Sequence, residues 1–247
     1  MTQLIKVCYR NILENSTITV SSENASYPKY RLYDRDIAKL FKFNAADDPS
    51  LITLDQGAVT SYPVSRLFIP VGHTLNGLAC KLQYSSDNFA ADSHDLVSWA
   101  QGDALLVDKA FAETTSRYWR LRVAAPASAV ELPEMFLTKP YQFARNISWG
   151  FTTGDRLNIL RQETPSGKVN YIKNGVPRKE RDYQLTRIQS AQKIEFQTWQ
   201  GVTEGIRAIY VEDEAGTVFF AEVLVPLKFT NEREGRWGCG LSLLEFI

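Results

Sequence analysis

The 247-residue sequence contains few of the residues that usually build metal and redox sites: two histidines, three cysteines and two methionines. The cysteines, Cys8, Cys80 and Cys239, are odd in number and lack the close spacing of metal ligands, so we expect buried free thiols. No Gly-x-Ser-x-Gly motif, phosphate-binding loop or Cys-His pair is present. We therefore predict that the chain is not an enzyme and needs no cofactor. A glycosidase stays open as an alternative, because its paired carboxylates converge only in the fold.

Net charge and long apolar runs are also lacking. Lysine plus arginine and aspartate plus glutamate both total 28, so the chain as a whole does not attract nucleic acid or an anionic membrane. No apolar run approaches the ~20 residues that span a bilayer, and Lys6 interrupts the short apolar start of the chain. We expect a soluble protein that is made in the cytoplasm and has no membrane contact.

Most of the chain consists of short runs rich in β-branched and aromatic residues, which are typical of β-strands. In the first half these runs predict strands at 51–55, 65–70, 80–85, 118–123 and 135–138. In the second half they predict strands at 193–199, 207–211, 217–225 and 237–246. Short helices are predicted at 31–40 and 184–193. An all-β chain follows, with antiparallel sheets.

A domain boundary is expected near Pro140, where one strand ends and a new apolar series begins. We predict two β domains, residues 1–142 and 143–247. Within the second, Asn174-Gly175 is a strong signal for a type I′ hairpin turn, and we expect 171–173 to pair with 176–178.

The first half resembles the discoidin or galactose-binding-type family. The matching segments, in the family's order, are Leu32-Tyr-Asp34-Arg-Asp36, Ile52-Thr-Leu-Asp55-Gln-Gly57, Leu67-Phe-Ile-Pro-Val-Gly-His73, Leu82-Gln-Tyr-Ser-Ser-Asp87-Asn88, Arg117-Tyr-Trp-Arg120 and Glu131-Leu-Pro-Glu134. The chain departs from the family pattern where glycine is missing after Asp34. The resemblance implies a jelly-roll β-sandwich whose loops at one end bind glycans or lipids, with a structural calcium in some members.

Candidate residues follow from this resemblance. Aromatic and polar side chains suited to a sugar are Tyr27, Tyr30, Phe43, His73, Asn76 and Trp99, and packing in the core or against a neighbour is the alternative role for the aromatics. Oxygen ligands suited to calcium are Asp34, Asp36 and Glu134, which are alternatively surface carboxylates.

The second half resembles C-terminal modules of phage distal-tail and related minor tail proteins. The matching segments are Arg161-Gln-Glu-Thr-Pro-Ser-Gly167, Asn174-Gly-Val-Pro-Arg178-Lys-Glu-Arg181-Asp-Tyr183, Ile209-Tyr-Val-Glu-Asp-Glu-Ala-Gly216 and Arg236-Trp237-Gly-Cys-Gly-Leu-Ser-Leu-Leu-Glu245. The resemblance implies an antiparallel β-sandwich or barrel that joins a ring at the end of a tail tube. It also implies a virion tail location after synthesis in the host bacterial cytoplasm.

Charged residues of the second half suggest how successive subunits of such a ring would align. Between residues 145 and 187 nine basic residues stand against four acidic ones, while an acidic turn follows later. In a homo-oligomer the two patches on successive subunits would attract each other, although a solvated hairpin face explains the basic run equally well. The candidate interface residues are Arg178, Lys179, Arg181, Glu212, Asp213 and Glu214.

Two functions are compatible with the sequence. In the first, the chain is a structural protein of a phage-like tail tip, whose partners are further copies of itself in a ring, the tail tube, the tail hub and a host-surface glycan, with DNA passing only through the lumen. In the second, it is a soluble carbohydrate-binding module or lectin with a spacer domain. Assembly into a ring would distinguish the first from the second.

Overall fold

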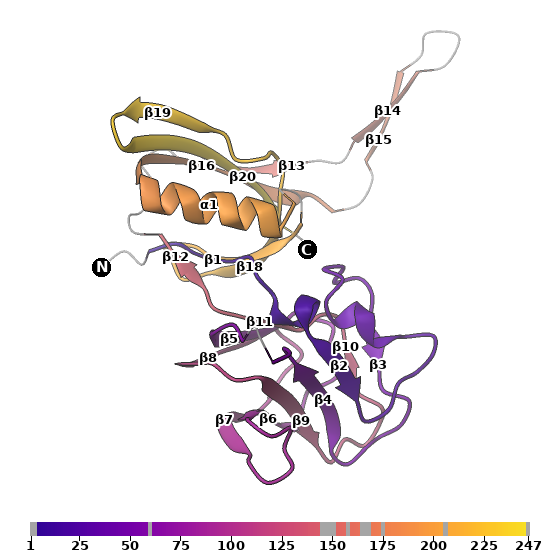
Figure 1. Ribbon diagram of the computed structural model, residues 1–247. Helices are drawn as coiled ribbons and strands as arrows, with labels where there is room; N and C mark the ends of the chain where they lie inside the picture. The colour runs from indigo at the N-terminus through magenta and orange to yellow at the C-terminus, as the bar shows by residue number, and fades with distance from the viewer. Residues whose placement is uncertain are drawn as a thin grey trace. The chain divides into compact units, whose positions relative to one another are not determined.

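The chain forms two compact units in the computed structural model, which describes residues 4–58, 61–143, 152–156, 159–163, 169–173, 176–204 and 207–245 (Figure 1). Arg10–Pro140 make one unit, here called the sandwich unit. Met1–Tyr9 and Tyr141–Ile247 together make the other, the discontinuous unit. The sequence predicted a division at residue 142, but it did not predict that the first nine residues belong with the C-terminal half.

The sandwich unit consists of antiparallel sheets. The five-stranded sheet has the order β2 (Thr17–Val20), β4 (Ser50–Asp55), β9 (Tyr118–Ala124), β6 (Ala79–Ser85) and β7 (His94–Ala100). The three-stranded sheet has the order β11 (Phe136–Thr138), β5 (Val64–Ile69) and β8 (Val107–Thr114). A two-stranded ladder joins β10 (Glu131–Leu132) to β3 (Phe41–Lys42), and two 3-10 helices precede it in the chain, η1 (Ile12–Asn15) and η2 (Lys29–Leu32).

Alternating strands explain how these sheets pack. In β4 every second residue is buried, and in β9 the same alternation buries Trp119, Leu121 and Val123. These side chains meet Leu67, Ile69 and other residues of the three-stranded sheet in one core. The β-sandwich predicted for the first half is therefore confirmed, and the five predicted strands of that half correspond to β4, β5, β6, β9 and β11.

Loops gather at the two ends of the sandwich. The register places Thr17, Asp55, Tyr118 and Ser85 at one end, where the chain also enters and leaves the unit. The opposite end, here called the loop end, carries residues 21–40, 43–49, 70–78, 101–106 and 125–130. The candidate glycan residues lie mostly at this loop end.

The discontinuous unit is built on one antiparallel sheet. Its main order is β12 (Tyr141–Gln142), β1 (Lys6–Cys8), β17 (Ile209–Glu212), β18 (Val218–Val223), β20 (Arg236–Glu245), β16 (Arg178–Gln189) and β13 (Thr152–Arg156), and β19 (Phe229–Arg233) pairs with β20. A separate ladder pairs β14 (Ile159–Glu163) with β15 (Val169–Lys173). Figure 1 shows the indigo β1 among strands from the far end of the chain.

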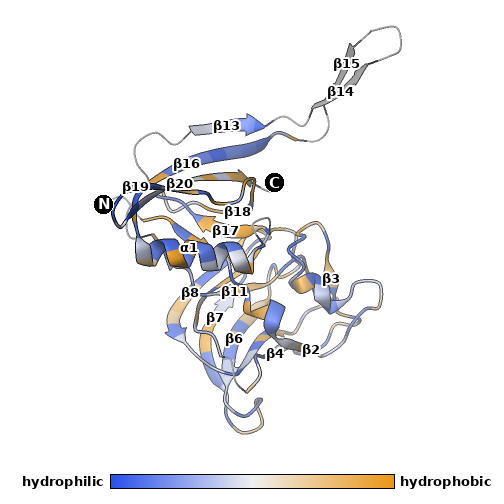
Figure 2. Ribbon diagram, turned by 45° about the horizontal axis from the view of Figure 1, so that its top comes forward, coloured by the Kyte–Doolittle hydropathy of each residue, from blue (hydrophilic) through white to orange (hydrophobic). Residues whose placement is uncertain are grey.

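Helix α1 (Ser190–Val202) covers a core that is formed by one face of this sheet. The helix buries Phe196 and Trp199, which are three residues apart and so lie on one helical face. Gln189 and Gln192 form a capping box at its start. Figure 2 shows both hydrophobic and hydrophilic stretches on α1, and a largely hydrophilic β16. The chain is mostly β as predicted, but in this unit a helix, rather than a second sheet, covers the core.

Local predictions were less accurate than the fold class. The predicted strand at 193–199 is wrong, because Ile194 and Phe196 suggest alternation whereas the buried pair has helical spacing. The helix predicted at 184–193 starts only at Ser190, and in place of the one at 31–40 the chain has η2 followed by turns. Residues 171–173 pair with β14 and not with 176–178, while Asn174-Gly175 lies outside the described residues.

Candidate functional site

Two exposed tyrosines distinguish the loop end of the sandwich unit. Tyr27 is 40% exposed and Tyr30 is 49% exposed, whereas the other Phe, Tyr and Trp side chains of this unit are buried or half-buried. The Arg31 guanidinium lies 5.3 Å from the centre of the Tyr27 ring, and Lys42 Nζ lies 6.0 Å from it. Lys42 also forms a 2.5 Å ion pair with Glu131. We call these five residues the tyrosine surface.

The backbone holds the tyrosine surface in place. Lys42 N–H donates to Tyr27 O, and Asn24 N–H donates to Lys42 O, so the segment before η2 runs along β3. On the other side of β3, Lys42 is the cross-strand partner of Glu131. Thr74 N–H donates to Glu131 O and Thr74 Oγ1 accepts from Glu131 N–H, which attaches the next loop. The backbone of Tyr27, Lys42 and Glu131 is thus held by its neighbours before any ligand binds.

The tyrosine surface carries two cations and one carboxylate, and all three charged residues are half-buried. The Glu131 carboxylate raises the pKa of Lys42, so this ammonium stays charged. Arg31 donates from Nη1 to Leu40 O at 3.1 Å, while its Nε is buried without a hydrogen-bond partner. The surface therefore offers two aromatic faces beside cationic donors and one carboxylate acceptor, which is the combination that orients sugar hydroxyls.

Of the other four glycan candidates, the structure leaves only Asn76 exposed. Phe43 is 1% exposed and packs edge-on against Phe41 in the core. His73 is also buried, since Nε2 contacts Leu105 O at 2.7 Å and Nδ1 accepts from Leu75 N–H. Trp99 is half-buried against the same core. Phe43 and His73 are accordingly removed from the candidate surface, because the rings fill space between loops.

The tyrosine surface contains three residues that the sequence did not single out: Arg31, Lys42 and Glu131. Lys42 and Glu131 are 89 positions apart and meet only because β3 pairs with β10. Both strands are two residues long, too short for a periodic pattern to reveal them. Arg31 follows Tyr30 directly, but neither residue marks a recognisable motif.

The candidate calcium ligands Asp34, Asp36 and Glu134 do not converge on one site. Glu134 is fully buried and accepts hydrogen bonds from Arg35 N–H at 3.0 Å and Asn11 Nδ2 at 3.4 Å. Burial and the nearby Asp34 raise the pKa of Glu134 well above its usual range. Asp36 pairs instead with Lys39 at 2.9 Å. No three His, Cys, Asp or Glu side chains of the described ranges are grouped so as to hold a metal ion.

Most of the candidate interface charges are paired within one chain. Arg181 binds Asp213 at 3.0 Å and Glu245 at 3.3 Å, and Glu212 binds Lys6 at 2.8 Å. Arg178 contacts Glu222 and the carbonyl of Glu245, whereas Lys179 is exposed and Glu214 half-buried. Within the acidic turn, Asp213 thus pairs with β16 and Glu212 pairs with β1, both inside the discontinuous unit. Reversing the charge of Arg181 would place a carboxylate beside Asp213 and Glu245 and would therefore disturb the fold itself.

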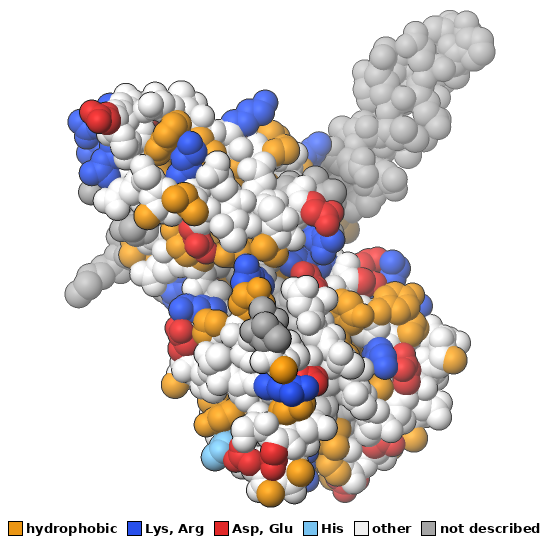
Figure 3. Space-filling view, viewed as in Figure 1, with side chains coloured by type: hydrophobic (Ala, Val, Ile, Leu, Met, Phe, Trp, Pro, Cys, Tyr) orange, Lys and Arg blue, Asp and Glu red, His pale blue; other side chains and the backbone are white. Residues whose placement is uncertain are grey.

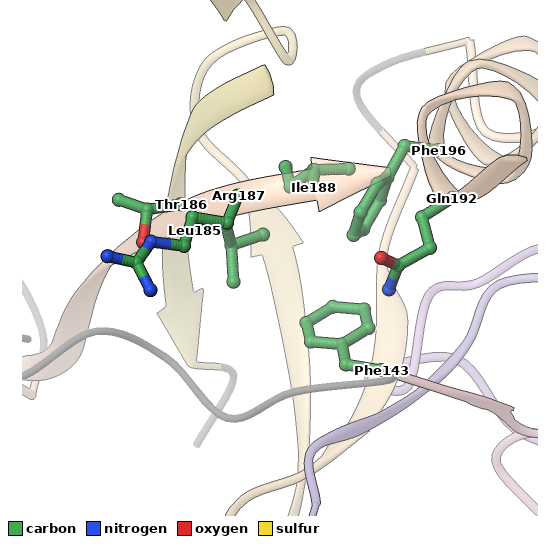
Figure 4. Close-up of a pocket in the computed structure, with 7 residues that line it drawn as sticks. All are labelled: Phe143, Leu185, Thr186, Arg187, Ile188, Gln192 and Phe196. Carbon is green, nitrogen blue, oxygen red and sulfur yellow. The ribbon is translucent and has the colours of Figure 1, made fainter. Parts of the chain in front are cut away.

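A small cavity lies where β16 meets the start of α1 (Figure 4). Its lining residues are Phe143, Leu185, Thr186, Arg187, Ile188, Gln192 and Phe196. The volume is about 20 Å³, which accommodates about one water molecule. Figure 4 shows the Arg187 guanidinium directed away from this space. The cavity is too small to bind a substrate.

The cysteines among the described residues are poor candidates for catalysis. Burial raises the pKa of the Cys80 thiol to about 12 and that of Cys239 to about 11, so neither is a nucleophile at neutral pH. All three cysteines are buried and none of them forms a disulfide, as predicted. Among the helices described here, none is long and apolar enough to cross a membrane.

Comparisons with known proteins give similarities of fold. No protein-family profile and no curated protein matches the sequence. A chitosan-binding module from a chitosanase/glucanase of Paenibacillus sp. IK-5 is 21% identical, with a TM-score of 0.46 over 53% of this chain and 99% of the module. CpGH89CBM32-5 from Clostridium perfringens, solved with GalNAc-β-1,3-galactose, is 15% identical, with a TM-score of 0.44 over 53% and 100%. A GH29 fucosidase from Ruminococcus gnavus is 15% identical, with a TM-score of 0.46 over 53% of this chain and 27% of the enzyme.

Proposed function

We propose that this chain is a glycan-binding protein whose sandwich unit takes a carbohydrate on the tyrosine surface. The observation that carries the proposal is the exposure of two tyrosine rings on loops held by β3 and β10. An exposed aromatic ring is available to cover the apolar face of a ligand. Tyrosine suits a sugar because the ring covers apolar C–H groups while the hydroxyl reaches polar ones.

Polar neighbours of the rings support a sugar over a purely apolar ligand. Lys42 donates and Glu131 accepts, and both belong to the same ion pair beside Tyr27. A pyranose presents hydroxyls that both donate and accept, so it would use both members of the pair. A lipid tail would leave the pair unused. We therefore prefer a carbohydrate as the ligand.

Glycan-array binding followed by titration calorimetry tests this function. We expect wild-type protein to bind at least one oligosaccharide on the array. Tyr27→Ala and Tyr30→Ala should each weaken that binding about ten-fold, since loss of a ring contact of about 1.4 kcal/mol has this effect. Tyr118→Ala is the matched control, because this half-buried tyrosine lies on β9 at the other end of the sandwich.

The control variant should bind as the wild type does, with all variants checked by thermal melting. Absence of array binding by the wild-type protein would exclude the proposal. Equal losses in all three variants would show that folding, rather than the tyrosine surface, controls binding.

The tail-tip role inferred from the second half of the sequence remains a prediction. The similar structures described above are carbohydrate-binding modules and a glycosidase, and none is named as a tail protein. Likewise, absence of enzymatic activity and a virion location stay predictions from the sequence. Light scattering on purified protein checks the ring: a stable multimer would favour it, and a monomer would favour an independent glycan-binding module.

A further inference from the structure

Two arginines that repel each other lie at the tip of the β19–β20 hairpin. Arg233 and Arg236 are direct cross-strand partners at the end of this ladder. On its other side, Arg236 is the partner of Gln189 in β16. Like charges directly opposite one another in a ladder destabilise it. Figure 3 shows Lys and Arg side chains gathered at this end of the hairpin, next to acidic ones.

Arg187 adds a third cation from the neighbouring strand. A register shift between Leu185 and Ile188 makes a bulge, in which Arg187 adopts a positive φ of 56°. The Glu232 carboxylate accepts from Arg187 N–H at 3.0 Å, which fixes the bulge against β19. This carboxylate occupies the space beside Gly238, where an added Cβ would lie 2.7 Å from Glu232 Oε1. The backbone of Arg187 is therefore held against the hairpin, and its side chain is exposed.

None of the three arginine side chains has an acidic partner within the described part of the chain. Arg236 Nη1 is buried and makes no hydrogen bond. By contrast, two arginines of the sandwich unit have acidic partners: Arg66 binds Asp108 at 2.7 Å, and Arg117 binds Asp55 at 2.7 Å. An unpaired buried guanidinium nitrogen costs free energy, which a bound anion would recover.

We propose that Arg187, Arg233 and Arg236 form a binding surface for a polysaccharide that carries carboxylate groups. The planar arginine fork matches a carboxylate through two parallel hydrogen bonds. Glu234, exposed in the turn between Arg233 and Arg236, supplies an acceptor for hydroxyl groups. Such a ligand offers anionic acceptors and hydroxyl donors together. This surface lies on the discontinuous unit and is independent of the tyrosine surface.

A nucleic acid fits this surface less well. The phosphodiester backbone of duplex DNA presents one negative charge per ~1.7 Å and only acceptors, so it would face Glu234 unfavourably. Single strands need free aromatic rings on which bases stack. The rings nearest the hairpin are occupied, because Lys193 Nζ covers the Trp237 ring at 3.3 Å and Phe229 packs against Phe196.

Native electrophoresis in gels containing polygalacturonate tests the proposal. We expect the acidic polymer to retard the wild-type protein, a dextran gel not to do so, and added salt to weaken the retardation. Arg233→Ala and Arg236→Ala should each raise the apparent Kd about ten-fold, the loss expected for one charge-assisted hydrogen bond. Arg156→Ala is the matched control, since Arg156 is an exposed arginine of β13 in the same unit.

Thermal melting supplies a second readout. Because the two arginines repel each other, each single substitution should leave the melting temperature unchanged or raise it. The surface is refuted if polygalacturonate does not retard the wild-type protein, or if Arg156→Ala binds as weakly as the hairpin variants. Tighter binding to duplex DNA than to polygalacturonate would also overturn it, in favour of a nucleic-acid surface. Tyr27→Ala should still bind polygalacturonate, so that failure here is distinguishable from failure of the tyrosine surface.

Discussion

One buried polar residue organises the base of the sandwich unit. Asn11 is fully buried, and its Oδ1 accepts from Leu137 N–H at 3.1 Å and Leu13 N–H at 3.3 Å. Its Nδ2 donates to Met135 O at 2.9 Å and lies 3.4 Å from Glu134. The amide thus satisfies both η1 and β11, elements that are more than 120 residues apart in the chain.

Asn11→Ala should destabilise the sandwich unit by roughly 2–4 kcal/mol, because buried N–H and C=O groups would lose their partners. Urea denaturation measures this loss. The matched control is Asn76→Ala, which removes an exposed amide at the loop end and should change stability by less than about 0.5 kcal/mol. A similar small effect at Asn11 would mean that water replaces the lost amide.

Glu134 makes the stability of the same unit depend on pH. Burial, followed by the charge of Asp34, raises the pKa of Glu134 above the ordinary 4.5. The folded state therefore binds a proton more tightly than the unfolded state does. The stabilisation that this proton provides is complete below pH 4.5 and is lost as the pH rises through the folded-state pKa.

Glu134→Gln removes this titration. We expect the stability of the wild type relative to Glu134→Gln to fall as the pH rises above about 4.5, measured by denaturation over a pH series. Glu131→Gln is the control, because Glu131 is partly exposed at the loop end and paired with Lys42. A stability difference that rose with pH would show that the carboxylate is better stabilised when folded than when unfolded.

At the scale of elements, helix α1 packs against both chain segments of the discontinuous unit. Trp199 is 2% exposed, and its ring packs 5.8 Å from Phe196 and 6.4 Å from Tyr9. Tyr9 also donates from its hydroxyl to Glu195, so the N-terminal segment is anchored to the helix. The helix therefore joins the two chain segments that make up this unit.

Trp199→Ala should cost about 3–5 kcal/mol, the usual loss for a buried tryptophan. Ile194→Ala on the same helix should be almost neutral, since Ile194 is 63% exposed. Nuclear magnetic resonance spectra would locate the damage: signals of Arg10–Pro140 should persist while those of the discontinuous unit broaden. Equal loss in both units would mean that they unfold as one cooperative system.

At the scale of the whole molecule, the first nine residues complete a sheet formed by the last hundred. Ile5 and Val7 are buried in the core of the discontinuous unit, and β1 pairs with both β12 and β17. Without β1, the edge of β17 and the apolar residues beneath it would be open to water. The discontinuous unit therefore needs β1 in order to fold, whereas the sandwich unit is a single continuous segment.

A fragment of residues 10–140 should fold alone, whereas a fragment of residues 141–247 should aggregate or remain partly unfolded. A synthetic peptide of residues 1–9, added in excess, should restore the cooperative melting of the second fragment by strand complementation. A peptide with Ile5 and Val7 replaced by serine is the control and should not rescue. Independent folding of 141–247 would show that β1 is dispensable.

The sequence alone determined the β class, five strands of the sandwich and the absence of a disulfide among the buried cysteines, because alternation and cysteine spacing are local properties. It named Tyr27 and Tyr30 as glycan candidates together with Phe43 and His73, although only the two tyrosines are exposed, since residue type does not reveal which side chain faces solvent. Only the tertiary structure decided that Lys42 meets Glu131, that β1 joins the C-terminal sheet and that Arg233 opposes Arg236. The reason is that register and strand order depend on contacts between distant segments, which no local pattern encodes.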